Sequence, residues 1–336
     1  MNNTTSHPFF SIIIPVYNRP QEVDELLESL THQSSMDFEV LIIEDGSQER
    51  CDKVVEDYSD RLTISYYFKE NGGPAAARNF GGERACGEWL IFFDSDCIIP
   101  EHYISTALLE LDKHDIQLFG GADRSHPSFT PLQKAIDYSM TSILTTGGIR
   151  GNKKSADKFY PRTFNMGIKR DIFKEIGGFS NMRFGEDVDF SYKVKEGGYE
   201  SRLFTENWVY HKRRNTLRTF FKQVFNSGIA RIHLTRRHPG SLKIVHLLPS
   251  AFVLGCIVLV AGGFFCPWAL VPIGLVALVL LTDAAIRTRS LRVSILAMIA
   301  SFTQLWGYGS GLIIGWWNIS IMHRHNYAAF VKNFYK

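Results

Sequence analysis

The chain has 336 residues, enough for one large domain or two ordinary ones, and its formal net charge of +3 conceals two parts of opposite sign. Residues 1–206 carry 22 Lys and Arg against 33 Asp and Glu, a net charge of −11, whereas residues 207–336 carry 15 against 1, a net charge of +14. The five cysteines show no CxxC spacing, which argues against a structural zinc site and a disulfide framework.

Four apolar runs in the first hundred residues predict buried strands, and a turn follows each of them. The runs lie within 9–17, 38–47, 62–68 and 89–93. Helices are expected from Pro20 to Leu30, then up to Tyr58, and after the glycine turn at 71–73. Strand, turn and helix repeated at this spacing predict an α/β fold with a mostly parallel sheet and flanking helices.

The fourth run ends in WLIFFDSDCIIP, which delivers Asp94 and Asp96 to one place. Alternation along an extended backbone would turn both carboxylates toward one ligand. Two like charges repel unless a cation lies between them, so a divalent metal is expected; a polar strand end that caps a loop is the alternative. Polar clusters also follow the other three runs, at 17–19, 44–46 and 71–79. Because ligands bind at the carboxyl ends of parallel strands, we expect one ligand site there.

Later in the chain, 116–123 is typical of another strand, and 124–163 of a loop-and-helix insertion. The C-terminal part then contains three apolar segments, 244–265, 267–282 and 293–317, and the first and third exceed the roughly 20 residues that span a bilayer. Basic residues before the first segment and after the second predict that both ends of this pair face the cytoplasm. The third segment either crosses or, through its glycines, lies re-entrant or interfacial; three buried helices of a soluble protein are the alternative.

The N-terminus, MNNTTSHPFF, lacks the basic and apolar regions of a signal peptide, so residues 1–206 are expected in the cytosol. We therefore predict a cytosolic domain at 1–210, and a basic juxtamembrane part at 211–243. A membrane region at 244–320 and a basic tail at 321–336 would follow. The predicted location is the inner (cytoplasmic) membrane, as a multi-pass protein.

Five motifs in order resemble the inverting family 2 glycosyltransferases of GT-A fold. They are IPVYNR (14–19), EDGS (44–47), NGGPAAARN (71–79), DSD (94–96), and NMGIKRDIFKEIGGF followed by GED (185–187). The resemblance covers about residues 8–240. It implies a Rossmann-like, mixed but mostly parallel sheet, followed here by transmembrane helices.

For the donor, the resemblance implies a nucleotide-sugar site. Pro15 and Tyr17 would line the base pocket, and Asp45 would bind the uridine, unless it only forms an Asx turn. Arg78 and Asn79 open a helix after glycines that let the backbone approach a ligand, and Arg78 would contact the nucleotide. A surface salt bridge is the alternative for Arg78.

For the chemistry, the resemblance implies that Asp94 and Asp96 hold Mn²⁺ or Mg²⁺ against the diphosphate, with Asp96 the more direct ligand. His211 would complete the metal site or, as part of a basic run, be interfacial. Asp187 would be the catalytic base, with Glu186 beside it to orient the acceptor. The alternative for GED is an acidic helix N-terminus.

The resemblance thus implies a membrane-anchored, metal-dependent inverting glycosyltransferase whose nucleotide-sugar donor, by family likeness, is UDP-linked. The acceptor would be a hydroxyl of a cell-envelope polysaccharide, glycolipid or lipid-linked intermediate. The QxxRW motif of processive synthases is absent from 220–237, which favours single sugar addition.

The basic stretch 211–243 would meet anionic headgroups or gather a lipid-linked acceptor, and nucleic acid is not expected. A polyprenyl-phosphate glycosyltransferase and a non-catalytic nucleotide-sugar-binding membrane protein are the alternatives. The insertion 124–163 would select the sugar.

Overall fold

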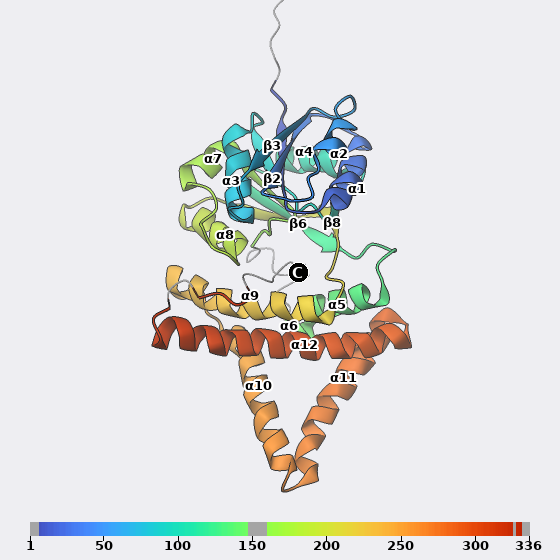
Figure 1. Cartoon of the computed structure of the whole chain (residues 1–336), viewed down its shortest axis with the longest axis vertical. Coiled ribbons are helices and arrows are strands. Elements are labelled where there is room, and N and C mark those ends of the chain that lie inside the picture. The colour runs from blue at the N-terminus through green and yellow to red at the C-terminus, as the bar shows by residue number, and fades with distance from the viewer. Residues whose placement is uncertain (1–6, 147–159, 325–326, 331–336) are drawn as a thin grey trace, which may run out of the picture. The chain divides into compact units, whose positions relative to one another are not determined.

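The computed structural model describes residues 7–146, 160–324 and 327–330 (Figure 1). Its contacts divide the chain into two compact units, one formed by 1–126 and 154–211 and the other by 127–153 and 212–336. The predicted continuous domain 1–210 is therefore interrupted, because residues 127–153 belong with the C-terminal helices. Part of the insertion 124–163, from 147 to 159, lies outside the described residues, as does half of the predicted tail 321–336.

The first unit is built on one eight-stranded sheet with the order β3-β2-β1-β4-β7-β6-β8-β5. β1 pairs in parallel with β2 and β4, and β2 pairs in parallel with β3, so this half of the sheet has the predicted βαβ topology. β7 is antiparallel to both β4 and β6, and the short β5 is antiparallel to β8. The strands are β1 (Phe10–Val16), β2 (Phe38–Asp45), β3 (Ile64–Lys69), β4 (Trp89–Phe92), β5 (Cys97–Ile98), β6 (Leu118–Arg124), β7 (Met166–Lys169) and β8 (Ser201–His211).

Helices cover both faces of this sheet because the parallel strands are apolar on both sides. In β1, Ile12 and Ile14 pack in one core with α1, α2 and α4, whereas Ile13 packs in a second core with α3, α7 and α8. Each such buried side chain contributes about 1.5–3 kcal/mol of transfer free energy. The helices are α1 (Pro20–Thr31), α2 (Asp52–Glu56), α3 (Pro74–Arg84), α4 (Tyr103–Lys113), α7 (Arg170–Ile176) and α8 (Glu186–Glu196).

Among its described residues, the second unit has helices and no strands. α9 packs along α12 at glycines of α12: a Cβ added to Gly311 would lie 2.1 Å from the carbonyl oxygen of Phe225. α5 contacts α11 through a hydrogen bond of 2.5 Å from Tyr138 Oη to Asp283 Oδ2, and the segment before α9 through an ion pair of 2.6 Å between Asp137 and Arg213. The elements are α5 (Pro131–Thr141), α6 (Ile143–Thr146), α9 (Leu217–Arg237), α10 (Ile244–Gly263), η2 (Pro267–Leu270), α11 (Val271–Thr288), α12 (Leu291–Trp316) and η3 (Trp317–Ile321).

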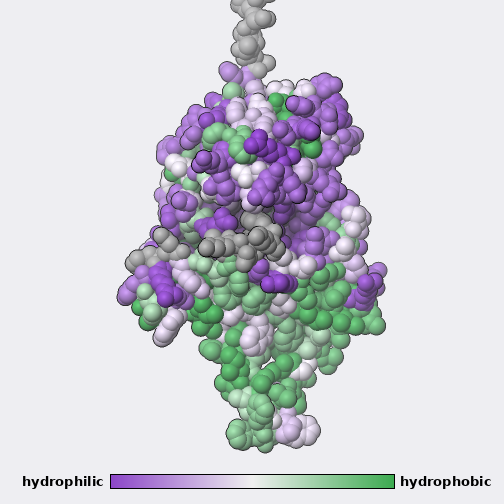
Figure 2. All heavy atoms as spheres, viewed as in Figure 1, coloured by the Kyte–Doolittle hydropathy of each residue, from purple (hydrophilic) through white to green (hydrophobic). Residues whose placement is uncertain are grey.

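Two helical segments of the second unit, Ile244–Gly263 and Pro267–Thr288, are long and apolar enough to cross a membrane, by length and composition. They form a hairpin whose arms leave the same side of α12 in Figure 1. Figure 2 shows hydrophobic residues gathered over these helices. Among the described helices α12 is not a candidate span by the same measure, which goes against a full crossing by the segment 293–317.

Candidate active site

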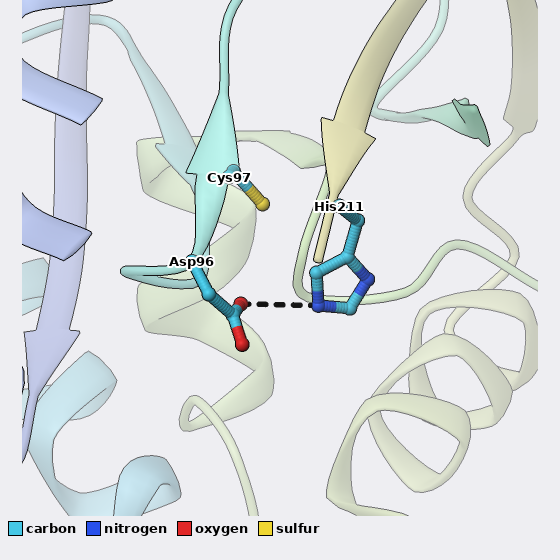
Figure 3. Close-up of side chains that lie close together, drawn as sticks. All are labelled: Asp96, Cys97 and His211. Carbon is cyan, nitrogen blue, oxygen red and sulfur yellow. Dashed lines mark ion pairs between the residues drawn. The ribbon is translucent and has the colours of Figure 1, made fainter. Parts of the chain in front are cut away.

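The DSD motif forms a turn that meets the end of β8. β4 ends at Phe92, and the amide of Cys97 donates to the carbonyl of Asp94 at 3.1 Å, so the two acids lie in a turn and not in an extended strand. The expectation that strand alternation aligns them is therefore wrong, although the turn still brings them together. His211 Nε2 lies 3.1 Å from Asp96 Oδ1 and 3.9 Å from Asp94 Oδ2 (Figure 3). The ring of Phe164 stacks on the His211 ring, with centroids 4.8 Å apart.

Two arginines neutralise the acidic turn. Arg19, which follows β1, reaches Asp96 Oδ2 at 2.7 Å. Arg78 reaches Asp94 Oδ1 at 2.6 Å and Glu186 Oε1 at 3.2 Å. Arg78 is only 3% exposed, so its ion pairs are not those of a surface residue. We had expected Arg78 to open α3. It lies instead in the second turn of that helix, because Pro74 occupies the first position.

The GED motif begins α8. Gly185 has a φ of +82°, a conformation that favours glycine, and it caps the helix so that Glu186 and Asp187 fill the first turn. This acidic helix N-terminus lies beside the DSD turn, because Arg78 links Glu186 to Asp94. The catalytic roles of Glu186 and Asp187 stay a prediction. Asp187 is paired with Arg162, whose Nη1 lies 3.3 Å from Asp187 Oδ2.

Burial controls two titrations at this site. Burial and then the charge of Asp187 raise the pKa of Glu186 to about 7, against the opposing effect of Arg78. Burial, together with the charges of Asp96 and Asp94, raises the pKa of the Cys97 thiol well above its ordinary value. Glu186 is consequently able to change its protonation near neutral pH, while Cys97 carries its proton there.

Asp45 ends β2 and organises the glycine turn before α3. Its carboxylate accepts hydrogen bonds from the amides of Gly72 at 2.9 Å and Gly73 at 2.8 Å, and it pairs with Lys69 at 2.6 Å. The preceding Glu44 is fully buried and accepts hydrogen bonds from Ser47, Cys51 and Tyr66. The EDG motif therefore holds its own loop in shape, and the predicted contact of Asp45 with a uridine stays a prediction.

The other predicted donor residues lie apart from this turn or have different partners. The side chain of Asn79 accepts from the amide of Phe179 and donates to its carbonyl, both at 2.8 Å, so it anchors the GGF loop. Pro15 lies in β1 opposite Ile43, and Tyr17 follows that strand with 36% of its surface exposed. Their contact with a nucleotide base stays a prediction.

Two residues at the site, Cys97 and Arg162, were not predicted, and Arg19 was predicted only as part of the polar cluster 17–19. Arg19 belongs to the IPVYNR motif and was visible as a conspicuous charge at a strand end. Cys97 and Arg162 gave no such signal, because the pairing of β5 with β8 and the position of Arg162 near α8 depend on contacts between distant segments.

The model of the family described as "Glycosyl transferase family 2" matches residues 11–177. An uncharacterized glycosyltransferase of Haemophilus influenzae is 33% identical over 221 residues, which cover 62% of this chain and 71% of that one. The chain belongs to glycosyl transferase family 2. The predicted family and enzyme class are thereby confirmed.

This family 2 glycosyltransferase is also similar to a second relative and to a solved structure. Glycosyltransferase AglE of Haloferax volcanii is 27% identical over 259 residues, which cover 75% of this chain and 82% of that one. The mannosyltransferase PcManGT of Pyrobaculum calidifontis, solved in complex with GDP-Man and Mn²⁺, has a TM-score of 0.64 at 17% identity and covers 90% of this chain and 88% of that one. The predicted GT-A fold is confirmed by this likeness and by the mostly parallel sheet.

Proposed function

We propose that this glycosyltransferase is metal-dependent, inverting and membrane-anchored, and that it adds one sugar from a nucleotide-sugar donor, UDP-linked, to an acceptor hydroxyl. The acceptor is a cell-envelope polysaccharide, a glycolipid or a lipid-linked intermediate. The observation that carries the proposal is the approach of Asp96 to within 3.1 Å and of Asp94 to within 3.9 Å of His211 Nε2, just beyond the carboxyl end of β4.

The donor set fits a divalent cation. Two carboxylates and an imidazole meet where the fold ends its parallel strands, and oxygen ligands suit Mn²⁺ or Mg²⁺. Asp96, Asp94 and His211 would hold the ion, and Arg19 would give up its contact with Asp96. A cation bound there supplies Lewis-acid stabilisation of the charge on the departing diphosphate. The Mn²⁺ in the mannosyltransferase of similar fold supports this assignment.

The acidic start of α8 supplies the remaining chemistry. In an inverting displacement the acceptor hydroxyl loses its proton as it attacks, and Asp187 accepts that proton. Asp187 is partly accessible, with 18% of its side chain exposed, so an acceptor can reach it. Arg78 couples Glu186 to Asp94, and this bridge keeps α8 in register with the DSD turn.

A membrane position for the second unit is supported by its surface. The hairpin tip carries Phe264, Phe265 and Trp268, each at least 80% exposed and none charged. Along one side of α12 and the following η3, exposed apolar residues recur at spacings that suit a helix lying in the bilayer surface: Leu291, Ile295, Ile299, Trp306 and Ile314 in α12, and Trp317 and Ile321 in η3. We assign α10 and α11 to the inner membrane and α12 to its cytoplasmic surface, the surface at which the headgroup of a lipid-linked acceptor would also lie.

The test is a donor screen with the purified full chain in detergent. UDP-, GDP- and dTDP-sugars are incubated with Mn²⁺ or Mg²⁺, and release of the nucleoside diphosphate is measured with and without lipid extracts. Asp96→Ala is the blank, because loss of the first metal ligand should abolish turnover. Release that is equal in Asp96→Ala and the wild type, or indifferent to chelator, would contradict the proposal.

Asp187→Asn then separates the two catalytic candidates. With a hydroxyl acceptor, loss of the base should lower turnover about 10²- to 10⁴-fold, while nucleotide affinity changes little. A polyprenyl-phosphate acceptor needs no base, and the pairing of Asp187 with Arg162 favours this second candidate because it competes with proton acceptance. Near-normal turnover of Asp187→Asn with a polyprenyl phosphate would establish it.

A further inference from the structure

Cys97 lies inside the metal-ligand cluster. The ligand atoms of Asp96, Cys97 and His211 are all within 4.8 Å of one another, and this is the only such group of His, Cys and acidic residues among the described parts of the chain. Figure 3 shows the sulfur of Cys97 on the same side of the turn as the Asp96 carboxylate and the His211 ring. The cluster therefore offers oxygen, nitrogen and sulfur at one point.

The sheet register explains why the sulfur is there. Cys97 and His211 are direct partners across the antiparallel pair of β5 and β8. Residues directly opposite each other in such a pair project to the same face, with Cβ atoms about 4.5–5.5 Å apart. Phe164 fixes both, because its ring stacks on His211 and its carbonyl accepts from Cys97 Sγ at 3.5 Å. Cys97 is 1% exposed, so these contacts and not solvent determine its position.

We propose that Cys97 gives this site a second mode of metal binding, in which a thiophilic divalent ion such as Zn²⁺, Cd²⁺ or Co²⁺ is held by Asp96, Cys97 and His211. The inference rests on the proposed metal site and adds a sulfur ligand to it. Hard ions select oxygen ligands, whereas thiolate and imidazole suit zinc and its neighbours. The two modes share Asp96 and His211, so they exclude each other, and a thiophilic ion displaces the activating one.

The thiol proton leaves to solvent when the ion binds. A coordinated thiol is deprotonated by the charge of its metal, which here also offsets the two carboxylates that disfavour the thiolate. Binding thus exchanges one proton for one metal–sulfur bond, and no oxidant or reductant is required.

Cobalt spectroscopy tests the sulfur ligand directly. The parent protein is the full chain with the exposed cysteines replaced, Cys86→Ser and Cys266→Ser, so that surface thiols do not contribute. On titration with Co²⁺ it should develop a thiolate-to-cobalt charge-transfer band in the near ultraviolet. Adding Cys97→Ser should remove this band and leave the weaker visible bands of bound cobalt. Adding Cys51→Ser, which removes a buried thiol beside Glu44, should leave the charge-transfer band in place.

A competition experiment gives a second readout. Bound Mn²⁺ is measured by electron paramagnetic resonance while Zn²⁺ is added. The Zn²⁺ concentration that displaces Mn²⁺ should be lower in the parent than in the Cys97→Ser protein by a factor of about ten or more. Cys97→Ala should behave like Cys97→Ser and replaces it if serine prevents folding. A band that persists without Cys97, or equal zinc displacement, overturns the inference. Failure of the parent to bind Mn²⁺ would instead refute the proposed hard-metal site, while a Cys97-dependent cobalt band would still stand.

Discussion

Each carboxylate of the DSD turn lies against an arginine of the same unit, and the two contacts differ in kind. Arg78 is buried and bridges Asp94 to Glu186, so it belongs to the framework of the site. Arg19 is 24% exposed at its side chain and touches Asp96, the acid assigned as the more direct metal ligand. Arg19 and a metal ion would therefore compete for one carboxylate.

We predict that Arg19→Ala tightens Mn²⁺ binding in the absence of donor. A partly exposed ion pair is worth about 0.2–1 kcal/mol, so the dissociation constant should fall by a factor of about 1.5–5. Electron paramagnetic resonance measures free Mn²⁺. Arg61→Ala is the matched control, because Arg61 pairs with Glu28 at the surface. Weaker Mn²⁺ binding by Arg19→Ala would mean that Arg19 supports the metal site.

Glu186 gives the folded protein a pH dependence of known sign. Its folded pKa of about 7 lies above the ordinary value of 4.5, so the folded chain keeps this proton to a higher pH than the unfolded chain does. Stability from this group is therefore fully present below about pH 4.5 and is lost as the pH rises to about 7.

We predict that Glu186→Gln removes this loss, because glutamine does not ionise. Relative to the wild type, the free energy of unfolding of the variant should rise between pH 5 and pH 7 by up to about 1.4 kcal/mol per pH unit. Thermal unfolding without added metal measures the difference. A difference between the two proteins that stays constant with pH would show that Glu186 does not titrate in this range.

At the scale of elements, the second unit depends on close helix contacts that glycine permits. α12 carries Gly307, Gly309, Gly311 and Gly315 on the sides that meet α9 and α10. A Cβ at Gly309 would lie 2.3 Å from the carbonyl oxygen of Pro249, and one at Gly311 would lie 2.1 Å from that of Phe225. Since backbone atoms cannot move aside, each added methyl group would push two helices apart.

We predict that Gly311→Ala destabilises the second unit by about 1–3 kcal/mol, the usual cost of overpacking. Gly274→Ala in α11 is the matched control, because a Cβ there meets nothing within 4 Å, and alanine should be neutral or slightly favourable. The two variants are heated in detergent, and their thermal stability is measured as the temperature at which the monodisperse chromatographic peak is lost. Equal stability of both variants would mean that α9 and α12 are less closely packed than this structure indicates.

At the scale of the whole molecule, charge and hydropathy separate along the chain. The net charge of −11 belongs to residues 1–206 and that of +14 to the rest, where Asp283 is the last acid and is engaged by Tyr138 and Arg287. The basic residues flank the apolar hairpin, which is the distribution that the proposed cytoplasmic orientation of its two ends requires.

Cys266 tests the proposed topology, since it lies at the hairpin tip and is exposed. If α10 and α11 both cross, a membrane-impermeant maleimide should label Cys266 in intact spheroplasts. Cys86, exposed in the catalytic unit, should react only after lysis. Cys266→Ser gives the background. Protection of Cys266 would indicate a re-entrant hairpin, and labelling of Cys86 without lysis would reverse the orientation.

The sequence by itself determined the class of fold, the four parallel strands and the positions of the acidic motifs. These follow from local signals, namely apolar runs, the turns behind them and the order of motifs. It also located the two apolar helices of the hairpin. The strands β7 and β8 lay beyond such reasoning, because β7 has only four residues and β8 is largely polar.

The tertiary structure decided which side chains meet. The β5–β8 register brings Cys97 and His211 together, Arg78 joins the motifs at 94–96 and 185–187, and the insertion helix α5 associates with the C-terminal helices. The sequence predicted the acids and placed Arg78 at the site, but not the pairing of Arg78 and Arg19 with those acids. The physical reason is that each of these contacts joins segments far apart in the chain, and their energies depend on burial and geometry that no local pattern encodes.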